Sequence, residues 1–519
     1  ATTRRTSVVV FIVRRLIVSF FVLVVATFIM YSLTALSGDP FEDLYGIQNA
    51  ADRERRMDAR AELLMLDKSI PERYLSWLGG VLGYLLPFVG GTLGRNINGQ
   101  EISTLLGQAL SATLQLVLAA TVLAIITGVT IGIVSALRQY SAFDYSITLV
   151  SFLFFSLPIF WVAILLKQYG AIKLNTWLAD PAITPTWLVG LSLLSAFFWT
   201  AILGGRQWKR RLIVFGSVFA ATAVLLYYLS FVRWFKTPSL GIPLMLMLAV
   251  GAAFAVTALT SGLGRRTVLY SALAAGGIGF VIYLVTLGVL DDPNWLLLLG
   301  LCAVTLALAG AAGWFLGGID REQAVRAAVL TGVAISVLGF ADHVLRAFPD
   351  YTRKVAGRPV ATIGSNTPNF RGDFWQTFLD SATHIVLPSI ALILISFATY
   401  TRYTRASMLE VMNQDYVRTA RSKGLTERTV VMRHAFRNAL IPVTTLMAID
   451  FGAVLGGAVI TETVFGWRGM GNLFITGLRP VPDPAPVMGF FIVVGAAVVI
   501  FNLIADIAYA FLDPRIRLS

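Results

Sequence analysis

"DYVRTARSKGLTERTVVMRHAFRNALIP", residues 415–442, is a charged and mainly basic stretch that lies between two long apolar runs. Asp415 is a favoured residue for capping the start of a helix, and Gly424 can take the left-handed conformation that ends one. Leu425 would supply the hydrophobic contact that often follows such a glycine. The stretch therefore predicts a short helix over 415–424 with a signal at each end.

A second helix is expected to follow directly. Thr426 can cap it, and Glu427 lies in its first turn, where an acidic side chain is favourable. The first helix would present a face of small and polar residues made by Tyr416, Thr419, Ala420 and Lys423. Such a face suits docking in the groove of another protein, although a basic loop beside anionic lipid can also serve only as a topological anchor.

The composition is that of an integral membrane protein. Of the 519 residues, 57% are hydrophobic and 13% are charged, and the mean hydropathy is +0.76. A soluble globular protein carries roughly twice that fraction of charged residues. Apolar runs long enough to span a bilayer recur without the alternating pattern of a membrane barrel, so an all-α fold is expected. The net charge of +13 is assigned to membrane orientation rather than to nucleic-acid binding.

About twelve apolar runs are expected to cross the membrane. They are 8–36, 110–137, 147–166, 187–203, 212–232, 241–261, 268–290, 295–317, 327–347, 385–400, 440–460 and 487–511. Arginines flank the first run, which lacks a small-residue cleavage site and is expected to be an uncleaved spanning helix with a cytoplasmic N-terminus. An even number of spans brings the tail, with Arg515 and Arg517, to the cytoplasm as well.

Several chemistries have no motif in this sequence. Cys302 is the only cysteine, and the three histidines have no ligand-like spacing, so neither a disulfide framework nor a metal site is expected. The phosphate loop G-x-x-x-x-G-K-[ST] is absent, as are H-E-x-x-H and G-x-S-x-G. The chain is therefore expected to be neither an ATPase nor another enzyme, and to bind no cofactor itself.

Six stretches carry a resemblance. They are DYVRTARSKGL (415–425), GDP (38–40), SLPIFW (156–161), RYTRASMLEV (402–411), RNALIPV (437–443) and GGAVITETVFGWRGMG (456–471). In their order and spacing they resemble the inner-membrane permease subunits of ABC-type importers of dipeptides and oligopeptides, over roughly 8–180 and 365–519. The signature of that family is EAA, three residues and Gly. Gly424 fixes the register, so Arg418 takes the Glu position, and Thr419 and Ala420 take the Ala positions.

The resemblance implies a type I ABC importer permease core of six transmembrane helices, into which this chain inserts about six more. It also implies that 415–424 is a coupling helix that docks on an ATPase subunit through Asp415, Tyr416, Arg418, Thr419, Ala420, Arg421, Lys423, Gly424 and Leu425. ATP and Mg would be bound by the partner subunits. The implied partners are a second homologous permease, two nucleotide-binding ATPase subunits, an extracytoplasmic substrate-binding protein, membrane lipid and a peptide substrate, with no nucleic acid.

The expected organisation has six parts. They are an N-terminal segment with the first helix (1–36), an external segment (37–108), core helices two and three (109–180), the inserted helices (181–350), a second external segment (351–384), and core helices four to six with the coupling helix (385–519). The insert is expected to be a lipid-facing or assembly module, with a second transport path as the alternative. Asp342, His343 and Arg346 would form a polar cluster there or meet headgroups and water.

Candidate pathway residues lie in the third core span and near the end of the chain. Pro158 would kink its span along the pathway, and Trp161 follows it, although membrane prolines are often only structural. Asp450, an ionisable residue within an apolar run, would contact the ammonium group of the substrate or hydrogen-bond to the partner permease. Glu462 is a further pathway candidate.

Residues 461–486 are too polar and proline-rich to span a membrane. By resemblance they form part of the outer gate and meet the binding protein through Phe465, Trp467, Arg468 and Gly469, with an ordinary connector as the alternative.

The sequence thus predicts a permease for peptides that works by alternating access in the inner membrane, driven by ATP hydrolysis on partner subunits. The alternative is a self-contained secondary transporter of about twelve helices, which would have related halves and buried charged networks. Dipeptides, longer oligopeptides, glutathione-like peptides and nickel chelates all stay open as cargo.

Overall fold

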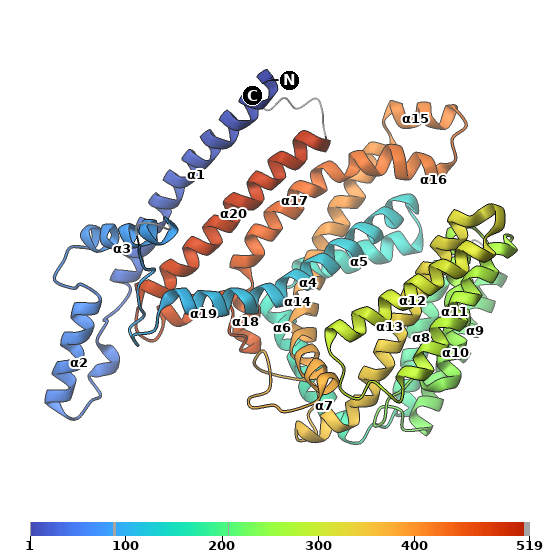
Figure 1. Cartoon of the computed structure of the whole chain (residues 1–519), viewed down its shortest axis with the longest axis horizontal. Coiled ribbons are helices and arrows are strands. Elements are labelled where there is room, and N and C mark those ends of the chain that lie inside the picture. The colour runs from blue at the N-terminus through green and yellow to red at the C-terminus, as the bar shows by residue number, and fades with distance from the viewer. Residues whose placement is uncertain (1, 87–89, 206, 513–519) are drawn as a thin grey trace. The chain divides into compact units, whose positions relative to one another are not determined.

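A computed structural model describes residues 2–86, 90–205 and 207–512 of the chain (Figure 1). The fold of these residues is helical, which confirms the expected all-α class. Arg515 and Arg517, on which part of the expected orientation rests, lie outside the described residues.

Contacts divide the chain into two units. The core unit comprises the described residues of Ala1–Gln168, Thr362–Ser365 and Ile385–Ser519, and the inserted unit comprises those of Tyr169–Ala361 and Asn366–His384. The core unit contains α1 (Thr2–Leu36), η1 (Glu42–Leu44), α2 (Ala50–Leu63), α3 (Ile70–Leu85), α4 (Ile102–Leu137), α5 (Ala142–Ser156), α6 (Ile159–Leu165), α15 (Asp415–Ser422), α16 (Glu427–Thr429), η4 (Val430–Ala435), α17 (Phe436–Gly457), α18 (Val459–Phe465), α19 (Met470–Leu478) and α20 (Pro484–Leu512). The inserted unit contains α7 (Leu174–Ala179), α8 (Pro185–Leu203), α9 (Trp208–Phe231), α10 (Gly241–Thr260), α11 (Arg266–Thr286), α12 (Trp295–Leu316), η3 (Gly318–Asp320) and α13 (Arg321–Lys354). The turn η2 (Leu166–Lys173) and the helix α14 (Phe374–Met412) belong partly to each unit.

Ten described helices are long and apolar enough to cross a membrane, and α5 with the helical stretch after it forms one further, bent pair. The chain is therefore a multi-pass membrane protein. The remaining expected run, 440–460, falls mostly within α17. α14 is much longer than the expected 385–400, and its end at Met412 leaves only two residues before α15.

Helices α4 and α14 approach closely at two glycines of the core unit. A Cβ atom on Gly128 would lie 2.6 Å from the Cβ of Tyr400, and one on Gly132 would lie 2.8 Å from the carbonyl oxygen of Thr401. Small residues let helix backbones come together in a membrane, where packing rather than the hydrophobic effect drives association. The two glycines therefore set the spacing between α4 and α14.

The segment expected to be external, 37–108, is largely helical and is attached to the rest of the core unit at both ends. The hydroxyl of Tyr74 in α3 donates a hydrogen bond to the carbonyl oxygen of Val24 in α1 (2.9 Å). Farther along, the N–H of Ile97 donates to Oδ2 of Asp483 (2.7 Å), a buried residue directly before α20. The segment is thus held against the first and last helices.

The inserted unit has its own buried ionic network. Asp342 of α13 is fully buried and accepts hydrogen bonds from the hydroxyl of Tyr283, Nε of Arg346 and the N–H of Leu240, each at 2.6 Å. His343 stacks on a tryptophan ring instead of joining this carboxylate. Asp342 and Arg346 therefore form a cluster, and the expectation that Asp342 meets headgroups or water is wrong. A fully buried carboxylate without a hydrogen-bonded partner would destabilise the fold too strongly.

We expect Gly132→Ala to destabilise the core unit by about 1–3 kcal/mol, because the added methyl group meets the backbone of α14. The matched control is Gly107→Ala on the same helix, where an added Cβ has no atom within 4 Å. Thermal unfolding of both purified variants in the same lipid measures the difference. Equal midpoints for the two variants would contradict the close approach of α4 and α14.

The carboxyl group of Asp483, 3% exposed, makes stability depend on pH. Burial raises the pKa of Asp483 to about 6. The hydrogen bonds from the N–H groups of Ile97 and Ala485 act in the opposite direction and lower the pKa, but burial is the larger effect. In the unfolded chain the group titrates near about 3.9. Because the folded pKa is the higher one, its stabilising contribution is fully present below about pH 4 and is lost as the pH rises through about 6.

Asp483→Asn should remove this part of the pH dependence. Between pH 5 and pH 7 the free energy of unfolding of the wild type should fall by about 1 kcal/mol more than that of the variant. Unfolding at the two pH values checks this, with Asp58→Asn, an exposed carboxylate on α2, as the control. The same pH dependence in wild type and Asp483→Asn would refute the assignment.

Candidate functional site

The basic stretch 415–442 forms the short helix α15 and then α16, η4 and the start of α17, which follow one another without a break (Figure 1). Gln414 occupies the N-cap position of α15, and its side chain makes no capping hydrogen bond. The expectation that Asp415 is the cap is therefore wrong by one residue. Asp415 lies in the first turn instead, where the helix dipole favours a carboxylate.

The end of α15 has the expected left-handed glycine. The helix ends at Ser422, and Gly424 has a φ of +75°. Leu425 is 40% exposed, and its expected hydrophobic contact at this end stays a prediction. Thr426 caps α16 as expected and accepts a hydrogen bond from the N–H of Thr429. The left-handed Gly424 and the cap at Thr426 give a tight connection between α15 and α16.

One side of α15 is buried against the core unit. Val417 and Ala420 pack with Met408 of α14, Val431 of η4 and Ala136 of α4. Ala420 was expected on the exposed docking face, and this expectation is wrong. Val417 and Ala420 are three residues apart and share the apolar side of the helix, so they fasten α15 to α14 and α4.

The opposite side of α15 is exposed and basic. The exposed residues over 415–423 are Asp415, Tyr416, Arg418, Thr419, Arg421, Ser422 and Lys423, and Asp415 forms an ion pair with Arg418 (3.8 Å). Arg421 forms an ion pair with Glu427 (2.8 Å), and the hydrogen bond from Arg421 holds the pKa of Glu427 below its usual value. Asn438 of α17 donates a hydrogen bond to the hydroxyl of Tyr416 (2.9 Å). The exposed face is thus ordered by contacts with α16 and α17.

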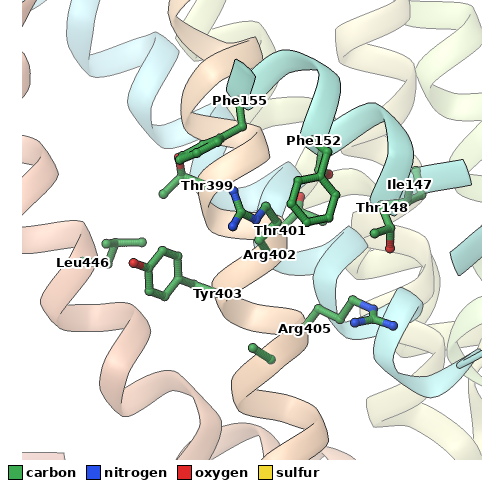
Figure 2. A pocket seen from close by; sticks show the side chains of 12 residues that line it. Ile147, Thr148, Phe152, Phe155, Thr399, Thr401, Arg402, Tyr403, Arg405 and Leu446 are labelled. Atoms are coloured by element: carbon green, nitrogen blue, oxygen red, sulfur yellow. The ribbon is translucent and has the colours of Figure 1, made fainter. Parts of the chain in front are cut away.

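A cavity of about 400 Å³ is lined by α5, α14 and α17 (Figure 2). Figure 2 shows the side chain of Arg402 directed toward two phenylalanines of α5. Its guanidinium lies 4.3 Å from the ring centroid of Phe155 and 4.6 Å from that of Phe152. In the part of the chain that the structure describes, no carboxylate pairs with Arg402. The cavity therefore contains a cation held by aromatic faces.

Arg405, one turn farther along α14, is neutralised. Its Nε donates to Oδ1 of Asp144 (2.7 Å), and its Nη2 donates to Oδ2 (2.9 Å). The hydroxyl of Ser135 adds a hydrogen bond to Oδ1 of Asp144 (2.5 Å). These three residues join α4, α5 and α14 beside the cavity.

The third core span is broken at the expected proline. α5 ends at Ser156, and the helix that begins at Ile159 is bent from it by 102°. Pro158 takes the N-cap position of α6 with an extended backbone, which confirms the kink. Trp161 is 54% exposed and lies outside the wall of the cavity. The roles of Pro158 and Trp161 in a pathway stay predictions.

Glu462 of α18 is fully buried and fastens the segment after α17 to α4. Its Oε1 accepts a hydrogen bond from the hydroxyl of Thr113 (2.7 Å), and its Oε2 accepts one from the N–H of Asn472 (3.1 Å). Thr113 in turn accepts the N–H of Met470 (2.8 Å). Gly469 leaves no room beside them, since a Cβ there would lie 2.4 Å from Glu462 and from Thr113.

The other expected gate residues differ in exposure. Phe465 and Trp467 are buried, and Nε1 of Trp467 donates to the carbonyl oxygen of Ala112 (2.9 Å). Arg468 is exposed. Among the expected gate residues, Arg468 is thus the one whose side chain can meet another protein directly, while the others hold the segment in place.

Asp450 of α17 has a partner within the chain that the sequence did not reveal. It accepts a hydrogen bond from the hydroxyl of Tyr400 on α14 (2.7 Å). Its two expected roles, contact with the substrate and contact with a partner permease, both stay predictions.

Known protein sequences are similar to parts of this chain. A sequence family described as "Binding-protein-dependent transport system inner membrane component" matches residues 210–518, more than half of the chain. The chain belongs to this family. The resemblance found in the sequence is confirmed, and the permease core with inserted helices is the fold of this chain.

Two relatives of this permease carry transport names. One is the "Oligopeptide transport system permease protein OppB" of Mycobacterium tuberculosis (strain ATCC 25618 / H37Rv), 41% identical over 156 residues, which are 30% of this chain and 48% of that protein. The other is the "Dipeptide transport system permease protein DppB" of Escherichia coli (strain K12), 44% identical over 140 residues, 27% of this chain and 41% of that protein. The chain spans about half the length of these relatives or less.

Sequence reasoning did not single out Arg402 or Arg405 of the permease. Both lie in the quoted stretch RYTRASMLEV, on a helix that continues an apolar run. Ionisable residues in such helices usually face a cavity or an ionic partner, and this rule could have identified both. Their partners on α5 are more than 200 positions away, so the pairing itself had no local signal.

We expect Gly424→Val to loosen the connection between α15 and α16, because a left-handed conformation costs a β-branched residue roughly 1–2 kcal/mol. Gly424→Asn should be tolerated, since asparagine adopts this conformation readily and an added Cβ there has no atom within 4 Å. Hydrogen exchange over 415–429 in the purified permease should be faster in the valine variant only. Equal exchange in all three proteins would contradict the strain.

Proposed function

We propose that this permease is the membrane-spanning subunit of an importer that moves dipeptides or oligopeptides across the cytoplasmic membrane. The family description and the names of the two relatives support this class of substrate. The observation that carries the proposal is α15, an ordered basic helix with one side packed on the core unit and the other side exposed.

In this proposal α15 docks on a nucleotide-binding subunit. The chain has no phosphate loop, so two partner ATPases would bind ATP and Mg. A second homologous permease and an extracytoplasmic binding protein would complete the importer, with Arg468 at the outer contact. The basic residues of α15 favour the cytoplasmic side, and in this proposal both chain termini would lie on that side as well.

The contacts of α15 give a physical route from ATP to the cavity. Only Asn413 and Gln414 separate α15 from α14, and Val417 packs beneath the helix on Met408. Movement of α15 by the closing ATPases would therefore be passed to α14. The ion pair between Arg405 and Asp144 links α14 to α5, so two walls of the cavity would move together in a hinge or shear switch that alternates access.

Isolation of the tagged chain from membranes in mild detergent tests this function. We expect ATPase subunits to copurify, and ATP hydrolysis by the reconstituted complex to rise when peptide and binding protein are added. Gly424→Val should lower that stimulation at least about tenfold. The left-handed conformation costs valine roughly 1–2 kcal/mol, and a change of about 1.4 kcal/mol in an activation barrier changes a rate tenfold. Gly424→Asn, the matched control, should keep it.

A secondary transporter would behave differently in the same experiment. It would purify without ATPase subunits and would accumulate substrate in vesicles under an ion gradient alone. Either result would contradict the proposed function.

A further inference from the structure

The cavity lined by α5, α14 and α17 has a polar arrangement that the proposed function leaves unused. We propose that it binds a carboxylate of the transported peptide, with Arg402 as the cation that receives it. This inference rests on the proposed import of peptides and adds a specificity site to it.

Arg402 differs from its neighbour Arg405 in having no anionic partner among the described residues. Arg405 donates to both carboxylate oxygens of Asp144, so its charge is balanced within the chain. Arg402 instead lies over the rings of Phe152 and Phe155, where its fork of N–H donors stays available (Figure 2). A guanidinium matches a carboxylate with two parallel hydrogen bonds, which makes this the natural ligand group.

Two buried hydroxyls in the cavity wall also lack partners. Ser151 is fully buried and Thr401 is 2% exposed, and both line the cavity. Neither hydroxyl oxygen has a hydrogen-bond partner in the described chain, not even the carbonyl one helical turn back. Buried polar groups are nearly always satisfied, and an exception calls for a missing ligand or water. Together with Arg402 they offer donors to an anionic group.

The rest of the wall suits the apolar part of a peptide. The cavity volume of about 400 Å³ lies within the range of small-molecule sites, and half of its twelve lining residues are aliphatic or aromatic, among them Ile147, Leu446 and the two phenylalanines. A carboxylate on Arg402 would leave an adjoining side chain against these residues. The C-terminal end of a peptide has this combination of groups.

The depth of the cavity disfavours a lipid headgroup as its occupant. Phe152 lies ten residues into α5, which places it about 15 Å along the helix axis from Ala142. The headgroup layer is only about 6 Å thick on each side of the hydrocarbon. With Ala142 at the membrane surface, Phe152 would lie deeper than that layer, and Ser151 and Thr401 are buried, which favours a peptide over a headgroup phosphate as the occupant.

The test compares a peptide with its C-terminal amide in the complete reconstituted transporter. Stimulation of ATP hydrolysis is measured against peptide concentration for wild type, Arg402→Gln, Thr401→Val and Ser151→Ala, with Arg55→Gln as an exposed control on α2. Any preference of the binding protein for the acid or the amide is the same for every variant. It therefore cancels when the acid-to-amide ratio is compared between variants.

We expect Arg402→Gln to lower the apparent affinity for the acid roughly tenfold to a hundredfold and to leave the amide unchanged, as for loss of a charged hydrogen bond. Thr401→Val and Ser151→Ala should each lower the affinity for the acid about threefold to tenfold. These two changes remove hydroxyls that bond to nothing in the described chain, so they keep the test decisive if Arg402→Gln does not fold. Arg55→Gln should behave as wild type.

Three results would overturn the inference. An acid-to-amide ratio that is the same in Arg402→Gln and wild type would assign Arg402 to structure only. A preference for phosphatidylglycerol over phosphatidylcholine bilayers that Arg402→Gln abolishes, with the ratio unchanged, would assign the cavity to lipid. A wild-type complex that copurifies with its partners but responds to no peptide would overturn the peptide substrate itself, and the carboxylate site with it.

Discussion

The buried ion pair between Asp144 and Arg405 is the constraint on which the core unit depends. Asp144 is 1% exposed, and both of its oxygens accept hydrogen bonds from Arg405, with a third from Ser135. Removal of one partner from such a pair typically costs about 3–5 kcal/mol, because the other charge is left buried and unpaired. The bidentate geometry also allows one arrangement only. It therefore fixes where α5 and α14 stand relative to α4.

Helix α4 is held at both ends by such buried polar contacts. Ser135, near its C-terminal end, contacts Asp144, and Thr113, near its N-terminal end, contacts Glu462. Between these points Gly128 and Gly132 bring α14 against it. α4 is thus the fixed element of the core unit.

Composition and the recurrence of long apolar runs were enough to predict the helical membrane fold. Local residue preferences were enough to predict the left-handed Gly424 and the cap at Thr426. The errors come from contacts that are remote in sequence. Asp415 is already part of α15, because α14 runs on to Met412 and only Asn413 and Gln414 connect the two helices, so that Gln414 takes the cap position. Ala420 turns inward because α4 and η4 offer an apolar surface there.

The candidate site was predicted less well than the fold, for the same reason. The segment 461–486 is polar enough to look like a surface connector, yet Glu462 and Trp467 find their hydrogen-bond partners on α4, hundreds of positions earlier. The role proposed for Arg402 depends on α5. Phe152 and Phe155 of that helix lie against its guanidinium, and Ser151 lines the same cavity. A local pattern identifies an ionisable residue in an apolar helix, but only the packing shows whether its charge is balanced.

The inserted unit illustrates how a core of this kind can accept additional helices. Its buried carboxylate, Asp342, is satisfied by Tyr283, Arg346 and the N–H of Leu240, all within the inserted unit. Helix α9 has no buried residue in the unit, and the apolar side chains it leaves exposed suit contact with lipid. The insertion thus satisfies this buried carboxylate with its own groups and needs no hydrogen bond from α4 or α5 for it.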